Sequence, residues 1–294
     1  MSTSHDVALI CVAGPVESAL LTEFADHYRR VGVREFRLAF HFPEDTPHDR
    51  EEILIRTARR HDIDPGIVSR GPWHEHVNAR LRDQLRQQTT AAWHLLTDID
   101  EFHQYPGSLG EVLELAAARH ARTVTGLLLD RVSADGTLPD AAAGLDATFP
   151  LGGFLTHSLL RGDPRKVVLA RPGTVIADGN HRSPGYRSPV PAVVPVHHFK
   201  WRAGVVEYLR QRLSNFETGR WRETRPAMRT EARLFLEWLS RHNGRIDVTG
   251  VTPWFRPVTL DTVAPWWPEA AAEIVATWRP DHLNHQMGVK NADA

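Results

Sequence analysis

The sequence predicts an α/β fold built on a mostly parallel sheet, and three observations support this prediction. The first expected strand, 7–13, is a continuous apolar run, as in a parallel strand that is buried on both faces. Apolar runs then alternate with amphipathic segments in a β-α-β-α-β-α-β order up to Phe102. The chain has 294 residues, of which 41% are hydrophobic, enough for one large α/β domain with a substantial core.

The individual elements follow from apolar periodicity and from glycine and proline breaks. Gly14-Pro15 ends the first strand, and Gly32 ends the helix expected over 17–30. Pro195 favours an edge position for the last strand. The further expected strands are 36–42, 66–69 (a short strand or turn), one starting at Trp93, 124–130, 166–171 and 193–200. The further expected helices are 51–61, 76–89, 109–120, 205–216 and 228–242, and 145–160 is predicted as a loop with one short helix.

The composition changes beyond Gly219, where tryptophan and proline become frequent. We therefore expect an α/β domain over residues 1–218 and a helical C-terminal extension over 219–294.

Charge and composition exclude several classes of function. The formal net charge of −1 provides no general attraction for nucleic acid or for an anionic membrane. The single cysteine, Cys11, excludes an intrachain disulfide and a thiolate zinc site. No apolar stretch is long enough for a transmembrane segment and no signal peptide is evident, so we expect a cytoplasmic location. Only Lys166, Lys200 and Lys290 are lysines among 35 basic residues, an imbalance that indicates a coding bias towards arginine.

Asp98 and Asp100 follow a short apolar run with β character. In a strand they would project to the same side, with Ile99 on the other. Two buried acids repel each other unless a positive group lies between them, and Mg²⁺ or Mn²⁺ prefers such oxygen ligands. The alternative is a polar strand end whose acids are solvated. Their expected position at the carboxyl end of a buried strand favours a ligand site.

The stretch Trp93–Phe102, which contains Asp98-Ile99-Asp100-Glu101-Phe102, resembles the D-x-D-E-F signature of family 2-like and family 92-like glycosyltransferases of the GT-A fold. Other parts resemble further elements of that group: the helix that begins at Glu17 and runs into 27–33, the segment 78–81, and the segment 196–201. The resemblance covers roughly residues 7–216. Val16 stands where an asparagine is common, which weakens the expected nucleotide contacts at the first helix.

The resemblance implies a GT-A-like domain over 1–218 and a metal-dependent glycosyltransferase. Such an enzyme moves a sugar from a nucleotide-diphosphate-sugar donor to an acceptor hydroxyl, here with inversion, and the acceptor would be a saccharide or a secondary metabolite. Mn²⁺ or Mg²⁺ would stabilise the charge on the departing diphosphate. The extension would then cover the sheet edge, help to form the acceptor pocket or make a homodimer contact.

The resemblance also implies roles for individual residues. The metal ligands would be Asp98, Asp100 and His198, with His197 and His181 as alternates and Glu101 in support. The nucleotide contacts would be Asp98, Glu17, Asn78 and Arg82. A packing role on a strand is the alternative for the histidine pair.

An inverting transfer needs a general base, usually a carboxylate within hydrogen-bonding reach of the acceptor oxygen. Asp130, at the end of the next buried strand, is the candidate, with Asp135 and Asp163 as alternates. Asp130 could instead pair with Arg131 or cap a turn.

Two other classes of protein are compatible with part of this pattern. Aspartyl-phosphate phosphatases also carry D-x-D after an apolar strand, but they have Thr or Val where Phe102 stands and hold the motif near the N-terminus. A non-catalytic nucleotide-sugar-binding or assembly module could use the same scaffold, with the Trp/Pro-rich extension as a partner surface.

Overall fold

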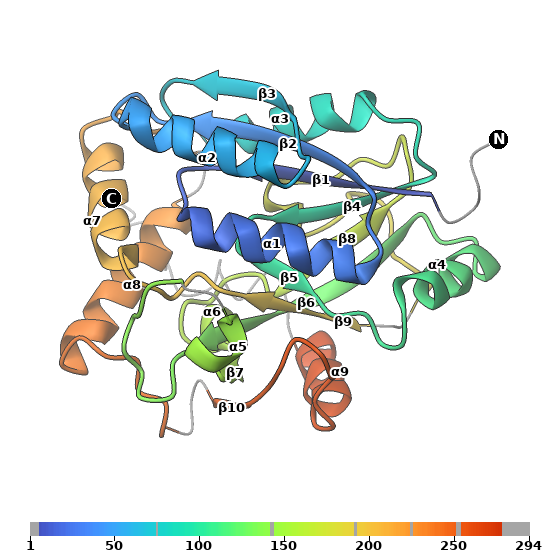
Figure 1. Cartoon of the computed structure of the whole chain (residues 1–294). Coiled ribbons are helices and arrows are strands. Elements are labelled where there is room, and N and C mark those ends of the chain that lie inside the picture. Colours follow the sequence, from blue (N-terminus) through green and yellow to red (C-terminus); the bar gives the residue numbers. More distant parts are fainter. Residues whose placement is uncertain are drawn as a thin grey trace, which may run out of the picture.

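Strand β1 (Val7–Ala13) lies inside the parallel part of the sheet, and all of its residues are buried. A continuous apolar run is what a strand covered by helices on both faces requires. The computed structural model describes residues 6–74, 76–141, 144–190, 193–223, 226–250 and 254–277. Over these residues the strands form a mixed sheet flanked by helices, so the predicted α/β class is confirmed (Figure 1).

The other elements follow the predicted order closely. The strands are β2 (Glu35–Phe42), β3 (Pro65–Arg70), β4 (Trp93–Asp98), β5 (Glu101–His103), β6 (Thr123–Val132), β7 (Leu151–Gly153), β8 (Arg165–Ala170), β9 (Val193–His198) and β10 (Arg256–Pro257). The helices are α1 (Ser18–Val31), α2 (His48–Arg60), α3 (His76–Gln87), α4 (Leu109–Ala118), α5 (Leu145–Thr148), α6 (Leu155–Ser158), α7 (Val205–Glu217), α8 (Ala227–Arg241) and α9 (Trp267–Thr277), with a 3₁₀ turn η1 (Asp178–Asn180). The stretch 145–160, predicted as a loop with one short helix, contains two short helices and the strand β7.

The sheet has a parallel half and an antiparallel half. β3, β2, β1 and β4 are parallel neighbours, and the order continues through β8, β6, β7 and β10 in antiparallel pairs. The carboxyl ends of the parallel strands point towards the side of the molecule where α7 and α8 lie (Figure 1). Because β8 runs antiparallel to β4, the first residues of β8 lie beside the carboxyl end of β4.

The position of β9 differs from the prediction. Pro195 favoured an edge strand, but β9 lies between β5 and β6. The proline is tolerated because it lacks only a donor, and its carbonyl still accepts a hydrogen bond from the backbone N–H of Gln104 at 2.9 Å.

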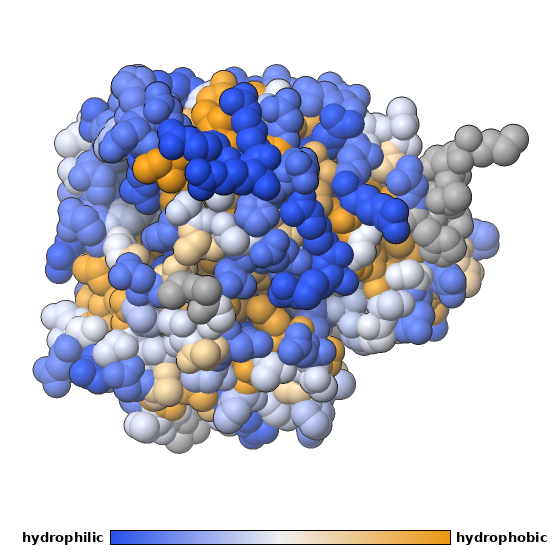
Figure 2. Space-filling view, viewed as in Figure 1, coloured by the Kyte–Doolittle hydropathy of each residue, from blue (hydrophilic) through white to orange (hydrophobic). Residues whose placement is uncertain are grey.

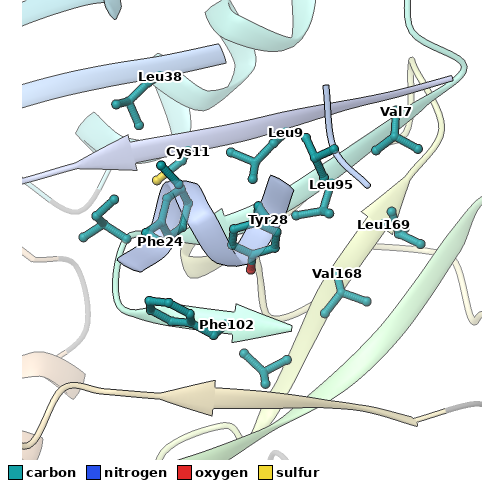
Figure 3. Close-up of a cluster of buried hydrophobic side chains, with 14 of the residues drawn as sticks. Val7, Leu9, Cys11, Phe24, Tyr28, Leu38, Leu95, Phe102, Val168 and Leu169 are labelled. Carbon is teal, nitrogen blue, oxygen red and sulfur yellow. The ribbon is translucent and has the colours of Figure 1, made fainter. Parts of the chain in front are cut away.

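Helices cover both faces of the parallel half. On one face, Phe24 and Tyr28 of α1 point towards Phe102 of β5 and pack with residues of β1 and β4 (Figure 3). On the other face, Leu81 and Leu85 of α3 pack against residues of the same two strands. The helix α1 ends at Gly32, whose φ of 101° is a left-handed conformation that glycine adopts without steric cost. Strands β1 and β4 are therefore buried on both sides, and only Asp98 at the carboxyl end of β4 is partly exposed.

The described part of the C-terminal extension shares its hydrophobic core with the rest of the chain. Phe235 of α8 stacks on Trp201, with ring centroids 4.3 Å apart. The strand β10 pairs with β7, and Trp267 of α9 packs on Phe154. The boundary at residue 218 stays a prediction, and residues 278–294 of the predicted extension lie outside the described residues.

The face formed by α1 and α2 is largely hydrophilic, and hydrophobic residues reach its surface only in separate patches (Figure 2). In the described ranges, none of the helices combines the length and hydropathy needed to cross a lipid bilayer.

Candidate active site

Asp98 and Asp100 lie where the chain leaves the parallel sheet. β4 ends at Asp98, which pairs in register with Val12 of β1, and Glu101 begins β5. Ile99 and Asp100 form the turn between the two strands, so a turn and not strand alternation sets the positions of the acids, in contrast to the prediction. The carboxyl ends of two parallel strands meet here, which is the usual ligand position in open α/β sheets.

Two side chains of α1 hold this turn in place. The hydroxyl group of Tyr28 donates to the carbonyl oxygen of Glu101 at 2.9 Å and lies 3.0 Å from Oγ1 of Thr97. The Nε2 atom of His27 is 2.9 Å from the carbonyl oxygen of His103. The adjacent His27 and Tyr28, part of the sequence resemblance, thus connect α1 to both ends of β5.

Lys166 lies between the acids and is almost fully buried, with 3% of its side chain exposed. Its ammonium group donates to Oδ2 of Asp98 at 2.9 Å and to the carbonyl oxygen of Gly179 at 2.8 Å. It also forms an ion pair with Oε1 of Glu101 at 2.7 Å. Three oxygen atoms, two from the acidic turn and one from the 3₁₀ turn η1, therefore surround one ammonium group.

Asp98, Glu101 and Lys166 shift one another's pKa values. Burial raises the pKa of Asp98, but Lys166 outweighs it, so the pKa lies below its usual value. Burial raises the pKa of Glu101 to about 7 in spite of the neighbouring lysine. Burial by itself lowers the pKa of Lys166, but Asp98 and Glu101 together raise it above its usual value. Lys166 and Asp98 are therefore charged at neutral pH, whereas Glu101 titrates near it.

His198, at the end of β9, lies between two carboxylates. Its Nδ1 is 2.9 Å from Oδ1 of Asp130, and its Nε2 is 3.9 Å from Oδ2 of Asp100. Burial lowers the pKa of His198, but the hydrogen bond to Asp130 and the charge of Asp100 raise it overall. The protonated form of the ring, with its positive charge between the two carboxylates, is therefore favoured.

Asp130 is fully buried, and both of its carboxylate oxygens accept hydrogen bonds. The donors are the backbone N–H of Thr156 at 2.6 Å, the hydroxyl group of Thr156 at 2.7 Å, the indole N–H of Trp201 at 2.8 Å, and His198. This arrangement orients His198. The role of Asp130 as general base stays a prediction, and its surroundings favour a positioning role because neither oxygen faces solvent.

The two alternates for the general base are also engaged by neighbours. Asp163 accepts two hydrogen bonds from the guanidinium group of Arg165, at 3.0 and 2.9 Å. Asp135 lies in the turn after β6, where Thr137 and Arg245 bind its carboxylate.

Arg202 connects Glu17 to Asp100. The Nε atom of Arg202 donates to Oε2 of Glu17 at 2.9 Å, and Nη1 of Arg202 lies 3.8 Å from Oδ2 of Asp100. Nη1 also donates to the carbonyl oxygen of Phe199 at 2.7 Å. Glu17, predicted to contact the nucleotide, therefore holds an arginine at the rim of the acidic turn.

Arg82 and Asn78 lie on α3 in different surroundings. The guanidinium group of Arg82 is buried and donates to the carbonyl oxygens of Ile176 and Ala177 and to Oδ1 of Asn180, each at 2.9 Å. It therefore anchors the loop that supplies Gly179 to Lys166, and its role as a nucleotide contact stays a prediction. Asn78 is exposed on the helix surface, and its predicted role is untested.

The two alternate histidines have other partners. His197 is buried between Arg131, whose Nη1 is 2.9 Å from its Nδ1, and Oε1 of Gln104, which is 3.1 Å from its Nε2. His181 binds the carbonyl oxygen of Arg165 through Nδ1 at 2.8 Å. His198 is the histidine that approaches Asp100.

The predicted set of three metal ligands is not assembled. Across the described residues, no three His, Cys, Asp or Glu side chains are placed to hold a metal ion. Asp98 is paired with Lys166, which leaves Asp100 and His198 facing each other. Their donor atoms suit a divalent cation, and the bond between His198 and Asp130 is typical of metal-bound histidines.

Comparisons with known proteins give distant structural likenesses. No protein-family model matches the sequence, and no curated protein matches it. The mannosyltransferase PcManGT from Pyrobaculum calidifontis, in complex with GDP-Man and Mn²⁺, is 13% identical, with 96% of this chain and 83% of that chain covered and a TM-score of 0.37. S. aureus TarS 1–349 is 11% identical, with 81% and 74% covered and a TM-score of 0.35. The match to TarS 1–349 in complex with UDP-GlcNAc is 15% identical, covers 44% of this chain and only 34% of that chain, and has a TM-score of 0.29. At these TM-scores the likeness carries no inference about function.

Two charged residues of the site were not among the predicted metal ligands, nucleotide contacts or general bases. From the sequence, Lys166 was a possible contact for phosphate or acceptor charge, with a solvated side chain as the alternative, and it is among three lysines in a chain that otherwise uses arginine. Arg202 had no signal of its own, because it lies one residue beyond the 196–201 segment of the resemblance.

Proposed function

We propose that this chain is a divalent-cation-dependent glycosyltransferase. It moves a sugar from a nucleotide-diphosphate-sugar donor to an acceptor hydroxyl, with inversion at the anomeric carbon. The acceptor is a saccharide or a secondary metabolite. One observation carries the proposal: Asp100 lies opposite Nε2 of His198 at the carboxyl ends of parallel strands, while Asp130 holds the other nitrogen of the ring.

Asp100 and His198 would hold Mn²⁺ or Mg²⁺. A carboxylate on the far nitrogen of a metal-binding histidine fixes the ring and raises its basicity, which is the role of Asp130 here. A bound ion would supply Lewis-acid stabilisation of the negative charge on the departing nucleoside diphosphate. Two protein ligands are a suitable number, because Mg²⁺ is commonly held by one or two protein groups together with substrate phosphates.

The remaining charged groups prepare the site for an anionic donor. Arg202 places positive charge 3.8 Å from Asp100, and Lys166 neutralises the acids on the other side of the turn. The carboxylate of Asp98 is 39% exposed, so it can accept hydrogen bonds from the ribose of the donor. Burial of Lys166 and Glu101 keeps water away from these charges, which strengthens their mutual attraction.

A module that binds a nucleotide-sugar without turning it over is the second candidate. It is favoured by one observation: a third protein ligand for a metal is missing in the described part of the chain. This candidate predicts donor binding with neither transfer nor hydrolysis of the donor.

The proposal can be tested by a thermal-shift screen of nucleotide-sugars with and without Mn²⁺. A donor at about 100 times its dissociation constant stabilises a protein by about 2.7 kcal/mol, so the matching donor should raise the melting temperature by several degrees. We expect Asp100→Asn to lose the Mn²⁺-dependent part of this shift. The matched control is Asp64→Asn, because the side chain of Asp64 is 86% exposed.

Transfer and hydrolysis of the matching donor are then measured with the same proteins. We expect turnover to disappear in Asp100→Asn and in excess chelator and to persist in Asp64→Asn. An Asp100→Asn protein that transfers sugar at the wild-type rate would show that the metal assignment is wrong. Donor binding by the wild type without any turnover would support the binding module.

A further inference from the structure

The ammonium group of Lys166 occupies a position that a metal ion could otherwise take. Its three neighbours are a carboxylate oxygen of Asp98 at 2.9 Å, a carboxylate oxygen of Glu101 at 2.7 Å and the carbonyl oxygen of Gly179 at 2.8 Å. Two carboxylates and a carbonyl are also the ligand types that hard divalent cations prefer. A lysine has three donors, so this position uses its full hydrogen-bonding capacity.

The position of Lys166 is determined by the surrounding fold. The antiparallel register of β8 against β4 brings Lys166 to the carboxyl end of β4. The Gly179 carbonyl lies in a turn with a φ of 67° at that glycine, and Arg82 anchors the turn from α3. The side chain is 3% exposed, so the ammonium group is shielded from solvent.

We propose that Lys166 is a positioning residue that holds the place of a cation between Asp98 and Glu101, so that Asp98 meets the donor through hydrogen bonds and is not a ligand of the divalent cation. The part of this statement that concerns the donor rests on the proposed function. The part that concerns Lys166 and its two carboxylates stands on the geometry of the chain alone.

The arrangement on the other side of the turn agrees with this assignment. Asp100 lies 3.9 Å from His198 and 3.8 Å from Arg202, whereas the ion pairs of Lys166 within the described part of the chain are with Asp98 and Glu101. The two aspartates therefore have different positive neighbours. Lys166 lies beside Asp98, and His198 and Arg202 lie beside Asp100. A divalent cation next to Lys166 would also be repelled by the ammonium charge.

The experiment is a Mn²⁺ titration by calorimetry, without nucleotide, on four proteins: the wild type, Lys166→Gln, Lys166→Arg and the double variant Lys166→Gln/Asp98→Asn. Removal of the ammonium group frees two carboxylates for a metal. We therefore expect Lys166→Gln to bind Mn²⁺ roughly tenfold more tightly or better than the wild type, the size of effect typical for changes around a metal site. Lys166→Arg keeps the charge and should bind as the wild type does, and the double variant should lose the gain.

An Lys166→Gln protein that binds Mn²⁺ no more tightly than the wild type would overturn the proposal. If that variant does not fold even with Mn²⁺, single variants in the wild-type background decide the question. We expect Asp98→Asn to leave Mn²⁺ affinity unchanged within error and Asp100→Asn to reduce it, and equal losses in the two variants would contradict the assignment. Because these titrations contain no nucleotide-sugar, a gain in Lys166→Gln would stand even if no donor bound the wild type.

Discussion

The imidazole of His198 lies between two carboxylates, and the two have different roles. Asp130 is fully buried and saturated by hydrogen bonds, so it acts as a fixed acceptor that sets the tautomer of the ring. Asp100 is partly exposed and lies 3.9 Å from the opposite nitrogen, so it can share a ligand with that nitrogen. At the scale of single residues, burial thus separates the acid that positions the ring from the acid that we propose as a cation ligand.

A second histidine, which lies away from the candidate site, links the stability of the protein to pH. His94 is 1% exposed, and its Nδ1 accepts a hydrogen bond from Nε of Arg86 at 3.0 Å. Burial, followed by the charge of Arg86, lowers its pKa from 6.5 to about 4. The unfolded chain therefore takes up this proton at a higher pH than the folded chain. Its contribution to stability is present above about pH 6.5 and is lost as the pH falls towards 4.

We expect His94→Gln to reduce the acid sensitivity of the protein. Between about pH 7 and about pH 4.5, the free energy of unfolding should fall by roughly 2–3 kcal/mol less in this variant than in the wild type. The measurement is urea unfolding at the two pH values. The control is His48→Gln, since the side chain of His48 is 80% exposed. An identical acid dependence in His94→Gln and the wild type would show that His94 is not held neutral by the fold.

At the scale of elements, the site is assembled where β4, β8, β9 and α1 meet. The helix α1 holds β5 through His27 and Tyr28, and β8 delivers Lys166 to the end of β4. The turn η1 contributes the carbonyl oxygen of Gly179 to the group around Lys166. Arg82 of α3 anchors this turn. The conformation of the loop 176–180 thus helps to decide where a charged side chain of the candidate site lies.

We expect Arg82→Met to loosen the loop 176–180 and to weaken donor binding indirectly. The loss of several buried hydrogen bonds from a charged donor should cost roughly 2–3 kcal/mol of local stability. Hydrogen exchange of the amides in 176–183 measures this loosening directly. The matched control is Arg80→Met, on the same helix and exposed to solvent. Weaker donor binding without faster exchange in this loop would instead support the predicted role of Arg82 as a direct nucleotide contact.

At the scale of the whole molecule, the C-terminal extension completes the core. Phe235 and Trp238 of α8 belong to one hydrophobic cluster with Trp201 and Leu209. Trp267 and Ile274 of α9 belong to another with Leu127 and Leu129 of β6. Both clusters pack on strand or loop segments that carry parts of the candidate site, so the extension stabilises the site from outside it.

We therefore expect a chain of residues 1–218 to fail to form a cooperative native state. Each large apolar side chain that loses its cover costs about 1.5–3 kcal/mol, and a few such losses exceed a typical total stability of about 5–15 kcal/mol. Near-UV circular dichroism and urea unfolding of the truncated chain, compared with the full chain, measure this. A soluble truncated chain with a sharp unfolding transition would instead support an independent domain with its boundary at residue 218.

The order of strands and helices could be predicted because each element has a local signal. These signals lie within short stretches of sequence. They are the buried apolar run of β1, the amphipathic periods of α1 and α8, and the glycine that ends α1. The place of Asp98 and Asp100 at a carboxyl edge followed from the same local order. The edge position predicted for β9 was wrong because a strand's neighbours are decided by distant segments, here β5 and β6.

By itself, the sequence determined the α/β class, the acidic pair at the carboxyl end of β4 and the histidine at the end of β9, since these depend on residue type and on periodicity along the chain. Only the tertiary structure decided that Lys166 neutralises Asp98 and Glu101, that Asp130 is buried behind His198, and that Arg82 anchors a loop. The partners in these contacts are 65 or more residues apart, as with the separations of 68 between Lys166 and Asp98 and between His198 and Asp130. Antiparallel register and burial, which no local pattern encodes, determine which charges meet and therefore which carboxylate remains available to bind a cation.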